Sequence, residues 1–164
     1  MRVRRLRHSI FVVLALLVGM GSTPFVVEAQ ETRSYKVILY LAEDGGTREA
    51  TIERLHEVWN ESQGPERLKA LLSTGNVRRL EEVTVLPNRE TPALKVGDVT
   101  VRVRGAYKDP KRDSMFLRVE IDGGQEAFVK EMISKFDETI VLAYPLATGD
   151  RSVVALIVPA PAGG

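Results

Sequence analysis

Apolar and polar residues alternate along most of the chain after residue 34, with the two-residue period of β-strands. The clearest case is residues 99–103, where Val99, Val101 and Val103 alternate with Thr100 and Arg102. This pattern predicts a strand that turns its valines to a core and its polar side chains to water. The same pattern, bounded by turn residues, predicts further strands over residues 35–41, 80–86, 93–96, 115–121, 139–143 and 152–158.

The period changes between Thr47 and Ser73. Apolar residues there recur at helical spacing in two groups, interrupted by Gln63-Gly64-Pro65. Pro65 suits the first turn of a helix, so the second group begins a new helix. The two groups are Ile52, Leu55, Val58 and Trp59, and then Leu68, Leu71 and Leu72. We expect two short amphipathic helices that cover one face of a sheet.

The segment from Gln125 to Phe136 fits two patterns. Phe128, Met132, Ile133 and Phe136 share a helical face, whereas Phe128, Lys130, Met132 and Ser134 also fit a strand. The strongly β-branched segments that follow favour the strand.

Tight turns separate the predicted strands, and this spacing favours hairpins and an antiparallel sheet. Gly97-Asp98 predicts one hairpin turn, and Gly149-Asp150 lies in the loop that would join the two last strands. The fold class we expect is α+β, with two short amphipathic helices packed on a mainly antiparallel sheet of about six strands.

The first 29 residues have the three-part layout of a secretory signal peptide. Four arginines precede an uncharged apolar run from Ile10 to Met20, and Val27-Glu28-Ala29 offers a small-residue cleavage site. The run is shorter than the roughly 20 residues that a membrane-spanning helix needs. We therefore expect cleavage after Ala29, export to the periplasm or the extracellular space, and no membrane insertion of the mature protein. Residues 30–164 would form a single domain with a frayed C-terminal tail.

Removal of the leader changes the charge of the protein. The whole chain has 23 basic and 22 acidic residues, and residues 30–164 retain 19 and 21, for a net charge of −2. The local basic groups, Arg78-Arg79 and Lys108 to Arg112, are followed by acidic residues, so we expect no nucleic-acid binding. The chain has no cysteine, which excludes disulfides, thiolate metal sites and cysteine nucleophiles.

Catalytic and metal-binding motifs are sparse. His56-Glu57 resembles the start of a zinc-protease motif, but Asn60 stands where the second histidine would be. We expect an exposed helical His56 and no metal site. No serine lies in a Gly-x-Ser-x-Gly turn, and no phosphate-binding glycine loop occurs. The acidic pairs Glu81-Glu82 and Asp137-Glu138 are charged, turn-adjacent stretches. The prediction is a protein without catalytic residues, cofactor or metal.

The segment from Thr139 to Pro159 resembles the closing strands of the secretin core. The resemblance consists of Thr139-Ile-Val-Leu-Ala, a loop with Gly149-Asp150, and Ser152-Val-Val-Ala-Leu-Ile-Val-Pro159. Ala143-Tyr144-Pro145 replaces the glycine pair after the first strand, and the loop is too short for a membrane-inserting hairpin. The resemblance implies at most a secretin-like module of the cell envelope that forms no pore.

Two functions fit these expectations. The first is an exported non-enzymatic envelope protein that binds a protein partner or self-associates, as an accessory of a secretion or pilus assembly. The second is a small-molecule or glycan binding protein, or a minor hydrolase, that uses Trp59, Tyr107 and nearby carboxylates. An exposed strand edge favours the first function, and a deep polar-lined pocket favours the second.

Overall fold

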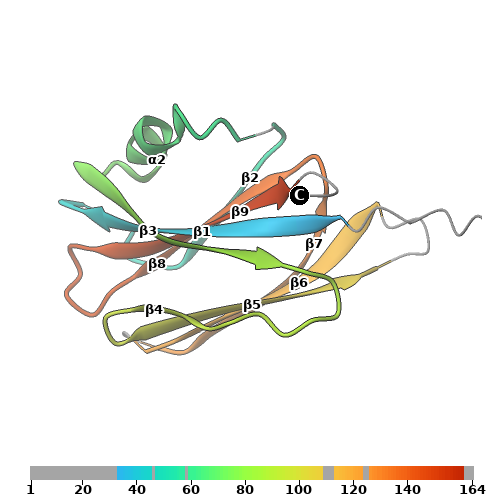
Figure 1. Ribbon diagram of the computed structural model, residues 1–164. Coiled ribbons are helices and arrows are strands. Elements are labelled where there is room, and N and C mark those ends of the chain that lie inside the picture. The colour runs from blue at the N-terminus through green and yellow to red at the C-terminus, as the bar shows by residue number, and fades with distance from the viewer. Residues whose placement is uncertain (1–32, 46, 58, 109–112, 124–125, 161–164) are drawn as a thin grey trace, which may run out of the picture. The chain divides into compact units, whose positions relative to one another are not determined.

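The computed structural model describes residues 33–160, apart from residues 46, 58, 109–112 and 124–125. The predicted signal peptide, its cleavage site and the last four residues lie outside the described residues. The described chain forms nine strands and one short helix (Figure 1). The elements are β1 (Ser34–Glu43), β2 (Thr51–Leu55), α2 (Gly64–Leu72), β3 (Asn76–Val85), β4 (Leu94–Val96), β5 (Val99–Tyr107), β6 (Ser114–Asp122), β7 (Phe128–Lys135), β8 (Thr139–Pro145) and β9 (Ser152–Ala160).

The strands form two antiparallel sheets, so the predicted α+β fold with a single sheet of about six strands is wrong. The first sheet has the order β2-β8-β9-β1-β3, and the second has the order β4-β5-β6-β7. The local pattern finds most strands but does not say which of them share hydrogen bonds. β1 pairs with β9 and β3, which are distant in sequence, whereas β4 to β7 pair in chain order.

The first of the two predicted helices is also wrong. Residues 51–55 form strand β2 and pair with β8, and Val58 lies outside the described residues. In this strand Ile52 packs with the core between the sheets and Leu55 with the cluster on the opposite face of the sheet. Pairing with the apolar strand β8 therefore overrides the helical spacing. The second helix is confirmed as α2, with Pro65 in its first turn and Leu68 fully buried.

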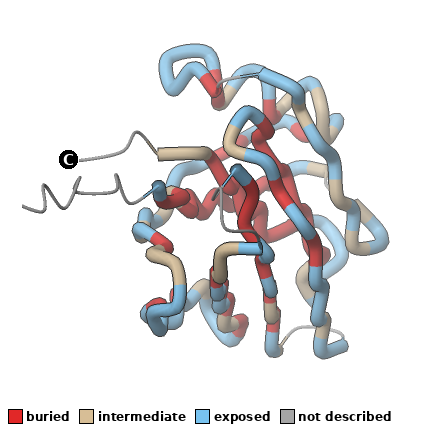
Figure 2. Tube along the Cα trace, turned by 90° about the vertical axis from the view of Figure 1, so that its right-hand side faces the viewer, coloured by how far each residue is buried: buried red, intermediate tan, exposed pale blue. Residues whose placement is uncertain are grey.

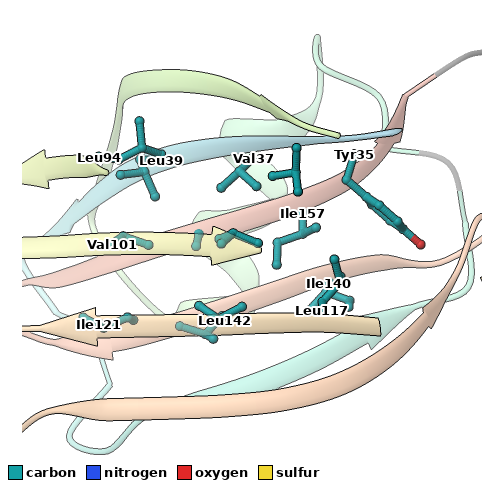
Figure 3. Close-up of a cluster of buried hydrophobic side chains, with 14 of the residues drawn as sticks. Tyr35, Val37, Leu39, Leu94, Val101, Leu117, Ile121, Ile140, Leu142 and Ile157 are labelled. Carbon is teal, nitrogen blue, oxygen red and sulfur yellow. The ribbon is translucent and has the colours of Figure 1, made fainter. Parts of the chain in front are cut away.

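A hydrophobic core fills the space between the two sheets. Figure 3 shows side chains of β1, β8 and β9 pointing toward those of β4, β5 and β6. The valines of β5 belong to this core, and Arg102 and Arg104, which alternate with them, are exposed, as the sequence predicts. Four side chains in this core are fully buried: Val99, Val101, Leu117 and Ile157. The two sheets therefore stabilise each other by removing apolar surface from water.

A second cluster covers the other face of the five-stranded sheet, where α2 packs (Figure 1). We call this the helix-side face. Ile38 and Tyr40 of β1 contribute to it, together with Trp59 and Leu68. A Cβ atom at Gly64 would lie 2.6 Å from Cζ2 of Trp59, so only glycine fits where the helix begins. The central strands are therefore buried on both faces, and Figure 2 shows their burial along the middle of the fold.

For the segment from Gln125 to Phe136, the strand interpretation is confirmed over residues 128–135. β7 pairs with β6, and Met132 and Ser134 turn inward while Val129 and Ile133 turn outward. The terminal hairpin is also confirmed, because β8 and β9 pair antiparallel and lie inside the five-stranded sheet.

Candidate functional site

His56 is exposed, as expected, but it lies just after strand β2 and not on a helix. Its side chain is 78% exposed, and Nδ1 lies 3.8 Å from the carboxylate of Glu138. Glu57 instead contacts Arg67 of α2. A carboxylate and one histidine do not make a metal site, and the described residues contain no group of three or more potential His, Cys, Asp or Glu ligands.

One member of each acidic pair, Glu138 and Glu82, forms ion pairs with basic side chains. Glu138 is buried, and its Oε2 lies 3.1 Å from Nη1 of Arg54, which joins β2 to the turn after β7. Glu82 contacts Lys36 at 3.3 Å and also Arg79. Each of these carboxylates is thus paired with a cation, and each acts as a structural contact between neighbouring elements.

Trp59 and Tyr107, the two aromatic residues of the predicted ligand site, are not brought together. Trp59 is 6% exposed and belongs to the helix-side cluster. Tyr107 packs against the core between the sheets, and its hydroxyl donates to the carbonyl of Arg33 at 3.2 Å. The buried Trp59 ring therefore offers no stacking platform for a ligand.

Strand β3 is the longest open edge of the described sheets. It has ten residues and pairs with β1 alone, at the end of the sheet order. The other three end strands, β2, β4 and β7, have five, three and eight residues. The main-chain N–H and C=O groups on the free side of β3 have no neighbouring strand among the described residues, and such an edge is a template for another strand.

The edge of β7 is partly used within the fold. Nη1 of Arg54 donates a hydrogen bond to the carbonyl of Ile133 at 2.9 Å. The hydroxyl of Tyr35 donates another to the carbonyl of Lys135 at 2.8 Å. Two alternate carbonyls of this strand are therefore already bonded, which leaves β3 as the better edge for a partner.

A cleft of about 730 Å³ lies beside β3, between this strand and the turn that joins β4 to β5. We call it the edge cleft. Apolar side chains and charged side chains both line it, and three of the apolar ones, Leu80, Val96 and Leu146, also pack against the core between the sheets. The lining residues are Leu41, Arg78, Arg79, Leu80, Glu81, Lys95, Val96, Gly97, Asp98, Leu146 and Arg151.

The charges of the edge cleft are largely free. Arg79 turns its side chain to Glu61 and Glu82 on the other face of β3. The remaining three cations and two carboxylates that line the cleft give it a net charge of +1, opposite in sign to residues 30–164 as a whole. Arg78, Glu81 and Lys95 have no ionic partner among the described residues. The sequence identifies Arg78-Arg79 as a basic pair, but it cannot show that Lys95 and Arg151, which come from distant segments, face the same space.

A smaller apolar feature lies on the outward face of the four-stranded sheet. Phe116 of β6 is 37% exposed and Ile133 of β7, directly opposite, is 39% exposed. Next to this pair, Arg118 contacts both Glu120 and Glu131 at 2.7 and 3.0 Å. Hydrogen bonds to these carboxylates, Glu120 first, raise the pKa of Arg118, so the charges around the apolar pair are satisfied locally.

Comparison with protein-family models, with curated proteins and with solved structures finds no match for this chain. No described helix is long and apolar enough to span a bilayer.

Proposed function

We propose that this chain is an exported, non-enzymatic protein of the cell envelope that acts by contact with another protein along strand β3. The observation that carries the proposal is the open ten-residue edge of β3, bordered by the edge cleft. An extended partner segment can form main-chain hydrogen bonds to such an edge, while adjacent pockets select its side chains. Leu80 and Arg78, which line the edge cleft, would contact the side chains of such a partner.

Export and the envelope setting are further parts of the proposal, and they rest on the sequence. The signal-peptide pattern of residues 1–29 supports export, and the resemblance of residues 139–159 to closing secretin strands supports a role as an accessory of a secretion or pilus assembly. N-terminal sequencing of the exported protein should begin at Gln30. A full-length species that resists carbonate extraction would contradict cleavage and indicate a retained anchor.

The contact at β3 can be tested by site-directed photo-cross-linking. Because the chain has no cysteine, Arg78→Cys gives a single thiol for a benzophenone-maleimide label. Arg102→Cys is a matched control, since Arg102 is also an exposed strand arginine but lies on the outward face of the four-stranded sheet. We expect a discrete adduct in envelope preparations from position 78 alone. Equal adducts from both positions, or none from position 78, would contradict the proposal.

A small anionic ligand in the edge cleft is the second candidate function. The volume and cationic lining of the cleft favour it. Hydrogen exchange separates the two candidates, because a strand partner protects backbone amides along β3, whereas a small ligand leaves most of them exchanging as before.

A further inference from the structure

We propose that β3 pairs with β3 of a second copy of this chain, antiparallel and in one register, so that Arg79 lies opposite Glu82 of the partner subunit. The inference rests on the proposed contact along β3 and specifies its partner. The resulting two-fold dimer would join the two five-stranded sheets into one continuous sheet.

The pairing of β3 with β1 shows which face each β3 residue occupies. Arg79 pairs with Tyr40 and Glu82 pairs with Ile38. Both β1 residues belong to the helix-side cluster, so Arg79 and Glu82 lie on the helix-side face.

The other face of β3 is turned toward the edge cleft. Glu81 pairs with Leu39 of the core between the sheets, and Arg78 pairs with Leu41, which lines the cleft. A register shift between Leu39 and Tyr40 inserts Leu80 as an extra residue in β3. This β-bulge explains why Arg79 and Glu82, three positions apart, share a face.

An antiparallel pair with its two-fold axis between residues 80 and 81 keeps like faces together. Arg79 then lies opposite the partner's Glu82, and Val77 lies opposite the partner's Thr84, all on the helix-side face. On the cleft side, Arg78 lies opposite the partner's Val83. A shift by one residue would set helix-side residues against cleft-side residues, which the alternation of a sheet forbids.

The charges of β3 favour this register. Arg79 and Glu82 already contact each other within one copy, and the two-fold symmetry adds two contacts between Arg79 and the partner's Glu82 without placing like charges directly opposite each other. Arg78 becomes a diagonal neighbour of the partner's Glu81, so two groups that have no ionic partner among the described residues gain one. The same charges disfavour pairing with arbitrary strands, as charged residues on edge strands commonly do.

Charge-reversal variants test whether the contacts between Arg79 and the partner's Glu82 stabilise the dimer. We expect sedimentation equilibrium of the protein purified after export to show a monomer–dimer equilibrium. Arg79→Glu and Glu82→Arg should each weaken the dimer about tenfold or more, because each sets like charges opposite each other. An equimolar mixture of the two variants should form heterodimers, since Glu then faces Arg at both contacts. Arg102→Glu, with the same charge change on another face, should dimerise like the natural protein.

Cysteine pairs test the register. Directly opposite residues of antiparallel strands have Cα atoms about 4.5–5.5 Å apart, within the range of a disulfide. A mixture of Arg79→Cys and Glu82→Cys should therefore oxidise to a heterodimer, whereas either variant alone should not, because its thiols are three residues out of register.

Two outcomes would overturn the inference. A natural protein that stays monomeric at all concentrations, or a dimer that Arg79→Glu leaves unchanged, would show that a second copy does not occupy β3. If position 78 nevertheless cross-links to a different protein, the proposed contact along β3 stands and this inference alone fails. If no cross-link and no dimer form, both fail.

Discussion

The hydroxyl of Tyr35, near the start of strand β1 in the five-stranded sheet, forms a hydrogen bond with Oγ of Ser134 at 3.0 Å, on the edge strand of the other sheet. Both residues are fully buried, and the Tyr35 ring stacks on Phe136 at 4.9 Å. This contact joins the two sheets across residues that are 99 positions apart in sequence.

Burial raises the pKa of Tyr35 to about 12, with nearby carboxylates adding to the effect and the Ser134 hydrogen bond opposing it. Because the unfolded tyrosine ionises near pH 10, the contribution of Tyr35 to the free energy of unfolding is complete below pH 10. It is lost as the pH rises from 10 to 12, by at most about 3 kcal/mol. Urea melts of the natural protein should show this loss.

Tyr35→Phe is the control for that measurement. It should cost about 1 kcal/mol at pH 7, because the hydrogen bonds across the sheets are lost. It should also lose less stability than the natural protein between pH 10 and 12. Equal losses in both proteins would mean that Tyr35 ionises in the folded state as readily as in the unfolded chain.

Val101→Asp and Ile157→Asp should each unfold the domain. Both residues are fully buried in the core between the sheets, one from each sheet. An unpaired buried carboxylate costs several kcal/mol, against a total stability of about 5–15 kcal/mol. Arg102→Asp, next to Val101 and exposed, should melt within about 0.5 kcal/mol of the natural protein. Unchanged urea midpoints for the buried substitutions would contradict the strand faces described above.

His56→Ala should change the free energy of unfolding by less than about 0.5 kcal/mol, because the side chain is exposed and its contact with Glu138 is long. Glu138→Ala should cost more, about 1–3 kcal/mol, since it removes the buried partner of Arg54. Thermal melts of both variants decide the matter. A bound stoichiometric metal that disappears in His56→Ala would overturn the interpretation of His56 as structurally and chemically dispensable.

Truncation after Phe136 should give an unfolded or aggregating product. It removes β8 and β9, whose residues 140–143 and 153–157 are all buried and which lie inside the five-stranded sheet. Truncation after Pro159 should be silent, because only the last residue of β9 and the four residues after it are lost. A soluble fragment that ends at Phe136 and melts cooperatively would identify the hairpin as an accessory arm.

Helix α2 and strand β2 show where prediction from the sequence succeeds and fails. Pro65 and Leu68 identify α2 because a helix of this kind is specified by residues within a few positions of one another. Ile52 and Leu55 share the same helical spacing, yet they lie in β2 and pack with opposite sides of the sheet. The decisive partner of β2 is β8, nearly ninety positions away, and no local pattern contains that information.

Some features of the candidate site can be predicted from the sequence and others cannot. The basic pair Arg78-Arg79 and the acidic pair Glu81-Glu82 are visible in the sequence, where they indicate solvated charge. The position of β3 at an edge, and the edge cleft formed with Lys95 and Arg151, depend on the strand order and on how the two sheets are arranged. The faces of Arg79 and Glu82 depend on the bulge at Leu80, which only the pairing with β1 reveals.

Most strands, the terminal hairpin, helix α2 and the inward direction of Val99, Val101 and Val103 can be predicted from the sequence. These features follow from local periodicity and turn chemistry, which act over a few residues. The division of the strands into two sheets and the open edge at β3 became known from the tertiary structure. Strand pairing and burial join residues that are distant in sequence, so the free energy of these contacts depends on the whole fold.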